Sequence, residues 1–306
     1  MTVDSKGRGR SIFQYFLYGS LAFLVYYLVR NDLLHLPPIL SPIRALLAMF
    51  FLMLGFLMSA LVWKRLLALC AFEVSLAQSV ASIGLSVFGK YIPGKIWVVV
   101  GRAAYLSEKL LGPLVPISAI SLAEQLISLW TGLGLGVFGL LLLGRLSGFS
   151  WGLLPVWLAL FLIACDPRAH RVLEAIGRKL LRRDVDLPHL SLTLVLSTLP
   201  YFLALWLSWS AGLYFLATSL VPAEIPFAAG LAFPFAACVG IVVLIAPGGL
   251  GIREGLVAGY LVMAGLDLAQ AKTIAVTSRL WFLVGEALFF LSALLVDRLS
   301  RPPRKP

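Results

Sequence analysis

Charged side chains lie inside or beside the apolar stretches of this sequence, where a charge is costly and indicates a functional site. Arg253 and Glu254 follow a hydrophobic run, and Arg279 lies in the next long one. A guanidinium group presents several donors in one plane, which suits the oxygens of a phosphate group. Glu254 and Glu286 could balance these cations or take up a proton. These residue types therefore predict a site for an anionic, phosphate-bearing group, and a structural ion-pair network is the alternative.

Arg253 and Glu254 are neighbours in the chain, so on a helix their side chains diverge by about 100° and each is expected to have its own partner. Three more charged residues complete the predicted substrate-binding set, namely Glu124, Lys95 and Arg102. Glu124 lies in the middle of a long apolar segment, which predicts that it is buried. Arg102 also fits a second role, in which its side chain extends to the cytoplasmic surface of the membrane.

Two proline-glycine breaks interrupt the hydrophobic sequence beside these charges. A proline removes a backbone donor and glycines weaken a helix, so the backbone at a break needs protein or water, not lipid, as its partner. The N-terminal amides of the helix after the second break also favour an anion there. The predicted structural breaks are Pro93 and Gly94 in the first case, and Pro247, Gly248, Gly249 and Gly251 in the second.

The composition is that of a polytopic membrane protein. Hydrophobic residues make up 60% of the 306 residues and charged residues 13%, so a soluble domain could not cover its own surface with polar groups. The net charge of +11 comes from Lys and Arg that lie mostly in short segments between apolar runs, where they set the orientation in the membrane. We therefore expect membrane lipids as partners and no binding of nucleic acid.

The sequence contains no recognisable arrangement of residues that predicts an enzyme. Cys70, Cys165 and Cys238 lie far apart in apolar sequence, which argues against a disulfide framework and a metal site. A nucleophile with a nearby base and a phosphate-binding loop are not recognisable either. We expect no catalytic residues, no metal and no cofactor.

The expected fold is all-α, a single integral membrane domain over residues 1–306. We predict about six full transmembrane helices, the first at 12–29, and two re-entrant helical hairpins, about eight to ten hydrophobic helices in all. Basic residues place both tails, 1–11 and 298–306, in the cytoplasm, and the protein in the cell (inner) membrane. Residues 171–183 fit either an amphipathic helix on the membrane surface or a plain basic loop.

The first hairpin is predicted from the length of its legs. The second leg, 96–106, gives only about 16 to 22 Å, less than the ~30 Å of the hydrocarbon core. The first leg, 66–88, is long enough to cross on its own, so two full crossings remain an alternative. Trp63, just before this leg, fits an aromatic anchor at the membrane surface.

Each break is followed by a short leg, a turn and a long span that contains polar residues, which predicts an internal repeat of about 66–143 and about 225–296. In this topology the first break opens toward the cytoplasm and the second toward the outside, so the two halves are inverted. Inverted repeats whose broken helices meet at the midplane form the substrate site of many secondary transporters. Chance similarity between two apolar segments is the alternative explanation.

The stretch Pro-Gly-Gly-Leu-Gly-Ile-Arg-Glu at 247–254, with Pro-Gly-Lys-Ile-Trp at 93–97 and Gly101-Arg102, resembles the flippase-like membrane domain of lysylphosphatidylglycerol synthase and its stand-alone relatives. The resemblance covers about residues 10–298. In the synthases this region moves an aminoacylated lipid between the leaflets, and a soluble aminoacyltransferase domain follows it. The sequence stops at Pro306 without such a domain, so we expect no synthase activity.

The resemblance implies a flippase or translocase for an anionic phospholipid or a lipid-linked substrate. A small-solute secondary transporter or channel is the alternative, because an inverted repeat permits it equally well. A membrane-embedded enzyme acting on lipid headgroups is less favoured, because the acid-base or metal constellation that it needs is not recognisable. Homo-oligomerisation is a further expectation that the sequence leaves open.

Overall fold

The regular elements of the structure are helices. The computed structural model describes residues 37–91, 96–110, 113–145, 191–242 and 251–300, with a few more between 151 and 166. Four of its helices are long and apolar enough to cross a membrane, by length and composition: α2 (Pro42–Leu69), α5 (Leu114–Leu142), α8 (Leu192–Leu220) and α11 (Leu268–Leu299). The predicted span at 12–29 and the basic segment 171–183 lie outside the described residues.

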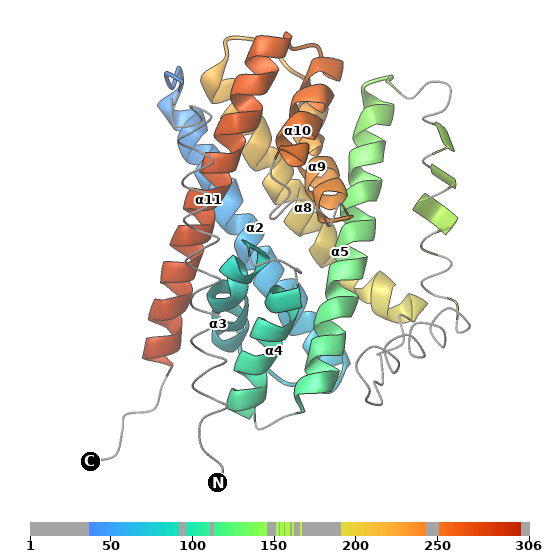
Figure 1. The fold of residues 1–306 in the computed structure, drawn as a ribbon, viewed down its shortest axis with the longest axis vertical. Coiled ribbons are helices and arrows are strands. Elements are labelled where there is room, and N and C mark those ends of the chain that lie inside the picture. The colour runs from blue at the N-terminus through green and yellow to red at the C-terminus, as the bar shows by residue number, and fades with distance from the viewer. Residues whose placement is uncertain are drawn as a thin grey trace.

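Apart from the few described residues between 151 and 166, the other described helices are short and lie in two groups. The first group is α3 (Leu76–Ser86), the 3-10 helix η1 (Val87–Tyr91) and α4 (Ile96–Leu110), and the second is η3 (Phe227–Leu231), α9 (Ala232–Val242) and α10 (Ile252–Met263). Figure 1 shows α3 and α4 beside the lower half of the long helices, and α9 and α10 beside the upper half. With 11, 15, 11 and 12 residues, α3, α4, α9 and α10 are shorter than the roughly 20 residues that cross a bilayer.

The packing of the helices is similar in the two halves of the described chain. In the first half α4 packs against α5 and α3 crosses over to α11, while in the second half α10 packs against α11 and α9 crosses over to α5. The long helices α2 and α8 pack against each other. Each half thus runs long, short, short, long, from α2 to α5 and from α8 to α11. The inverted relation of the two halves stays a prediction.

The first hairpin begins later than the sequence predicts. The helix α2 continues to Leu69, and the chain turns at Ala71, whose φ is 64°. A capping box then starts α3, in which the Ser75 hydroxyl accepts a hydrogen bond from Gln78 N at 3.1 Å and the Gln78 side chain accepts one from Ser75 N at 2.8 Å. The predicted leg 66–88 is therefore wrong at its start, because its first residues complete α2 and the turn.

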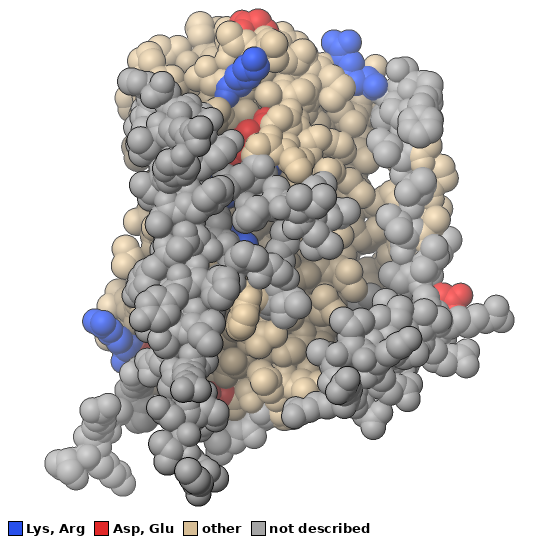
Figure 2. Space-filling model, viewed as in Figure 1, with Lys and Arg blue, Asp and Glu red and all other residues tan. Residues whose placement is uncertain are grey.

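The helix α11 has one face toward the surrounding medium and one toward the protein. Val284, Leu288, Leu291 and Leu295 are exposed and recur at helical spacing, as expected for a face that contacts lipid. Figure 2 shows mostly uncharged residues over the middle of the described surface, with most of the visible charged side chains toward its two ends. This distribution is that of an integral membrane protein.

Glycines on one face of α5 allow close contact with the second group of short helices. An added Cβ at Gly136 would lie 2.8 Å from Phe235 Cα, and one at Gly139 would overlap the Tyr260 hydroxyl. That hydroxyl donates a hydrogen bond to the carbonyl of Gly136 at 3.0 Å. Small residues at such contacts let helix backbones approach closely, which is how helices associate in lipid.

We expect Gly139→Ala to lower the free energy of unfolding by about 1–3 kcal/mol, because the methyl group overpacks this contact. The matched control is Gly259→Ala in α10, where nothing lies within 4 Å of an added Cβ. That control should be neutral or stabilising by up to about 1 kcal/mol, because Ala favours helix more than Gly does. Unfolding midpoints in detergent compare the two, and equal midpoints would contradict the close contact.

Candidate functional site

A glycine with a positive φ lies directly before the helix α10. Gly251 has a φ of 82°, which residues with a side chain rarely adopt, and it directly precedes Ile252. The Glu254 carboxylate accepts a hydrogen bond from Gly251 N at 2.7 Å and so caps the first turn. This local geometry fixes the positions of Arg253 and Glu254 on α10.

Arg253 and Glu254 have different neighbours. The Arg253 guanidinium lies over Phe233 of α9 and Phe282 of α11, 4.4 and 4.8 Å from the ring centroids. The face of an aromatic ring attracts a cation, and more strongly where water is scarce. Glu254 Oε1 lies instead 3.8 Å from Arg279 Nε of α11, and Arg279 is buried. Two residues that adjoin in the chain thus connect α10 to both α9 and α11.

Lys90, from the first group of short helices, reaches the same place. Its ammonium forms an ion pair with Glu286 of α11 and lies 4.9 Å from the centroid of the Phe282 ring. Arg253 and Lys90 thus both lie beside the ring of Phe282. We call this group the cation cluster, and it consists of Lys90, Arg253, Arg279, Glu254 and Glu286. Its members are three basic and two acidic side chains, which come from η1, α10 and α11.

Lys90 is absent from the predicted substrate-binding set. Its place next to the first break is the one signal in the sequence that could have pointed to it. Its partner Glu286 is 196 positions away in the chain, so no local pattern predicts their contact. The packing of α3 against α11 brings the two side chains together.

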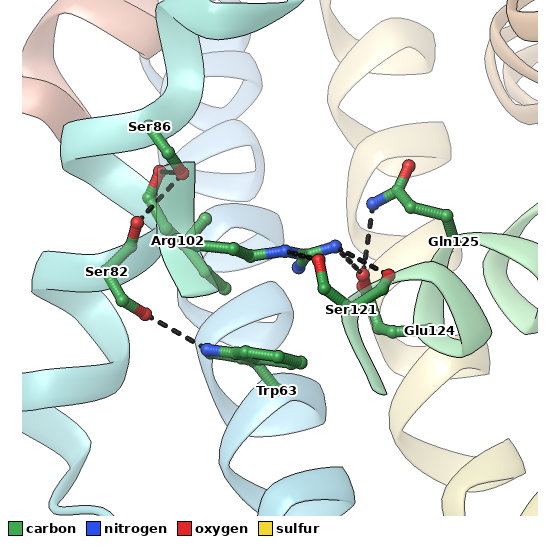
Figure 3. A network of polar contacts seen from close by, with 8 residues as sticks. Trp63, Ser82, Ser86, Arg102, Ser121, Glu124 and Gln125 are labelled. Atoms are coloured by element: carbon green, nitrogen blue, oxygen red, sulfur yellow. Dashed lines mark hydrogen bonds and ion pairs between the residues drawn. The ribbon is translucent and has the colours of Figure 1, made fainter. Parts of the chain in front are cut away.

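A second polar network lies between α4 and α5 (Figure 3). Arg102 of α4 donates to Glu124 Oε2 at 2.5 Å and to the carbonyl of Ser121 at 3.1 Å, and its Nε donates to the Ser121 hydroxyl. Gln125 Nε2 donates to the same Glu124 oxygen at 3.0 Å. Arg102 and Glu124 are both buried. The burial predicted for Glu124 is therefore confirmed, and the alternative in which Arg102 extends to the membrane surface is wrong.

Trp63 completes this network from α2. The Arg102 guanidinium lies 4.6 Å from the centroid of the Trp63 ring, and Trp63 Nε1 donates to the Ser82 hydroxyl of α3 at 3.0 Å. Trp63 is fully buried, so its predicted role as an anchor at the membrane surface is wrong. The reason is that α2 continues beyond it and packs against the first hairpin, which covers the indole.

Each half has an ion pair at the same place, but the positive and negative members are exchanged between the short and the long helix. In the first half a cation on α4, Arg102, pairs with a carboxylate on α5, Glu124. In the second half a carboxylate on α10, Glu254, pairs with a cation on α11, Arg279. Each pair joins the second short helix of its half to the long helix that follows. The first pair has Ser121 and Gln125 as further partners, whereas the second belongs to the cation cluster.

Several predicted site residues lie outside the described residues, namely Lys95, Pro93, Gly94, Pro247, Gly248 and Gly249. Within the described part of the chain, no group of three or more His, Cys, Asp or Glu side chains is placed to hold a metal ion. The two described networks consist of ion pairs and hydrogen bonds.

Comparison with known proteins agrees with a lipid-related membrane domain. No curated protein sequence shows significant similarity to this chain. The family model of the lysylphosphatidylglycerol synthase transmembrane region matches residues 12–285, which is most of the chain and includes the Arg102–Glu124 network and every residue of the cation cluster except Glu286. The protein therefore belongs to the family of the lysylphosphatidylglycerol synthase transmembrane region, a membrane domain related to lipid-modifying synthases and flippases.

Proposed function

We propose that this protein moves an anionic phospholipid, or another lipid with a phosphate-bearing headgroup, between the leaflets of the cell membrane without changing it chemically. The observation that carries the proposal is the cation cluster, whose three cations and two carboxylates lie among apolar helices. Charged side chains at membrane depth are costly and commonly mark a substrate path. An anionic headgroup is the ligand that Arg253 and Arg279 would attract.

The geometry of the cluster suits a phosphate group that arrives from the membrane. Arg253 is held against Phe233 and Phe282, so its planar group of donors is oriented before the ligand binds. The side chains of Lys90 and Glu254 are 30% and 16% exposed, so the cluster is not sealed off from the surroundings. Exposed leucines of α11 on the opposite face leave acyl chains an apolar surface nearby.

The short helices fit re-entrant hairpins, one opening to each side of the membrane. The helices α3 and α9 are each about 16 Å long and α4 about 22 Å, less than the ~30 Å of the hydrocarbon core. Their opposite positions in Figure 1 are those expected for an inverted repeat. Broken helices that end within the membrane place their backbone ends at a shared central site.

Reconstituted proteoliposomes test the proposed function. Fluorescent phosphatidylglycerol should exchange between the leaflets several times faster with the protein than without it, whereas zwitterionic phosphatidylcholine should exchange much less. Dithionite quenching of the outer-leaflet dye reports both rates. Equal rates for empty and protein-containing vesicles, with each lipid, would refute the proposal. Uptake of small anions without lipid exchange would favour the small-solute transporter instead.

The proposal includes an orientation in which both tails lie in the cytoplasm, and labelling of single cysteines tests it. Glu224 lies exposed between α8 and η3, and Ser300 lies exposed at the end of α11. In whole cells, a membrane-impermeant maleimide should label Glu224→Cys and should label Ser300→Cys only after the membrane is opened. The reverse pattern would invert the orientation.

A further inference from the structure

The helix α11 has three charged residues on the face that it turns to the protein, namely Arg279, Glu286 and Asp297. All three are buried. From Arg279 to Asp297 the helix rises about 27 Å, close to the ~30 Å thickness of the hydrocarbon core. At 3.6 residues per turn, Glu286 lies about two turns after Arg279, and Asp297 lies about three turns after Glu286. The three residues therefore share one face of the helix. We call this face the α11 stripe.

Each residue of the α11 stripe pairs with a different short helix. Arg279 lies 3.8 Å from Glu254 of α10, and Glu286 pairs with Lys90 of η1. At the lower end, Asp297 Oδ1 lies 3.3 Å from Lys109 Nζ of α4 and accepts a hydrogen bond from the Tyr105 hydroxyl at 2.6 Å. The side chains of Arg279, Glu286 and Asp297 are 5%, 0% and 6% exposed, against 16%, 30% and 35% for Glu254, Lys90 and Lys109.

The three ion pairs have a structural explanation, in which they only hold the short helices onto α11. Apolar side chains of similar volume would do this as well or better, because a buried ion pair gains little over a well-packed apolar pair. The partly exposed member of two of the pairs is a lysine, Lys90 or Lys109. In these two pairs the cation is more accessible to an anion than the carboxylate of α11, whereas at Arg279 the more accessible member is Glu254.

We propose that the α11 stripe is the path that the headgroup follows across the membrane, an inference that rests on the lipid translocation proposed above. Arg253 and Arg279 bind the anionic headgroup in the upper half, Lys90 holds it near the middle, and Lys109 with Tyr105 receives it at the lower end. At each position the headgroup oxygens bind the cation beside the carboxylate that is already paired with it. The acyl chains remain in lipid while the headgroup moves along the stripe.

The deciding experiment replaces both charged side chains at the middle position of the stripe with apolar side chains of similar volume. Lys90→Met combined with Glu286→Leu should leave the protein folded, because both charges disappear together. Exchange of fluorescent phosphatidylglycerol per folded molecule should fall by about tenfold or more, the effect of losing one charge-assisted contact. The control is Arg44→Gln, since Arg44 bonds to the carbonyl of Thr218, away from the stripe, and its rate should match the wild type.

A measurement on the unaltered chain covers the case in which that variant does not fold. Phosphatidylglycerol with a photoreactive group on the headgroup is reconstituted with the wild-type protein, illuminated, and the adducts are mapped by mass spectrometry. Adducts near Arg279, Lys90 and Lys109, at all three depths, support the path. Adducts confined to the level of Arg279 would overturn it.

The outcomes separate this inference from the proposed function. If the wild type exchanges phosphatidylglycerol and the Lys90→Met/Glu286→Leu protein, folded, exchanges it within twofold of the wild type, the path is wrong and the proposed function stands. If the wild type exchanges no lipid, the proposed function is wrong and the path fails with it.

Discussion

Replacing Arg253 by Lys should lower phosphatidylglycerol exchange by about 10- to 100-fold, although the charge is kept. A hydrogen bond to a charged group contributes about 1.5–3 kcal/mol, and an ammonium cannot present the planar donors of a guanidinium to a phosphate. The lysine variant also loses the broad contact of the guanidinium with Phe233 and Phe282, whose ring centroids lie 4.4 and 4.8 Å from the guanidinium carbon. Arg253→Ala should lose more, because the cation itself is gone.

The measurement is lipid exchange normalised to monodisperse protein, with Arg145→Ala as the matched control. Arg145 is an exposed cation that donates to the carbonyl of Met263 at 2.8 Å, outside the cation cluster, so its removal should leave the rate unchanged. A structural role for Arg253 predicts another pattern, with less folded protein but a normal rate per molecule. An unchanged normalised rate in Arg253→Ala would exclude this residue from the site and leave Arg279 and Lys90 as the cations to test.

The second large effect concerns stability and the Arg102–Glu124 pair. Arg102→Met alone should lower the free energy of unfolding by about 3–5 kcal/mol, because it leaves the buried Glu124 without its cation. Glu124→Leu alone should do the same to Arg102. The double variant should recover most of the loss, because no buried charge is left unpaired. Denaturant or thermal unfolding in detergent gives the three values, and a double variant as unstable as the sum of the single ones would refute the pairing.

The same double variant tests the substrate-binding role that the sequence predicts for Arg102 and Glu124. The structure places these two side chains against each other, with Ser121 and Gln125 as further partners. If they act in structure alone, the folded Arg102→Met/Glu124→Leu protein should exchange lipid at the wild-type rate. If they bind substrate, exchange should fall although folding is restored.

Local patterns were sufficient to predict much of the fold. Long apolar runs bounded by basic residues predicted membrane helices, since hydropathy depends on composition over about 20 residues. The burial of Glu124 followed from its place in the middle of such a run. The start of α3 was missed, although Ser75 and Gln78 form a capping box that the sequence displays, because most residues from 70 to 74 are apolar and hide the turn.

The contacts within the site depended on how the helices pack. The sequence predicted charges beside the breaks, including Arg253 and Glu254, and predicted that these two would have different partners. It gave no means to see that Phe282 would lie under both Arg253 and Lys90. The burial of Trp63 beneath Arg102 also required the first hairpin to pack against α2.

The sequence by itself determined the membrane class, the long helices and the kinds of side chain available for an anion site. The tertiary structure decided which of those side chains meet. It joined Lys90 to Glu286 across 196 positions, and it paired Arg102 of α4 with Glu124 of α5 while it gathered the cation cluster from η1, α10 and α11. The physical reason is that hydropathy and helix capping act over a few residues, whereas an ion pair requires two helix faces to pack in one register.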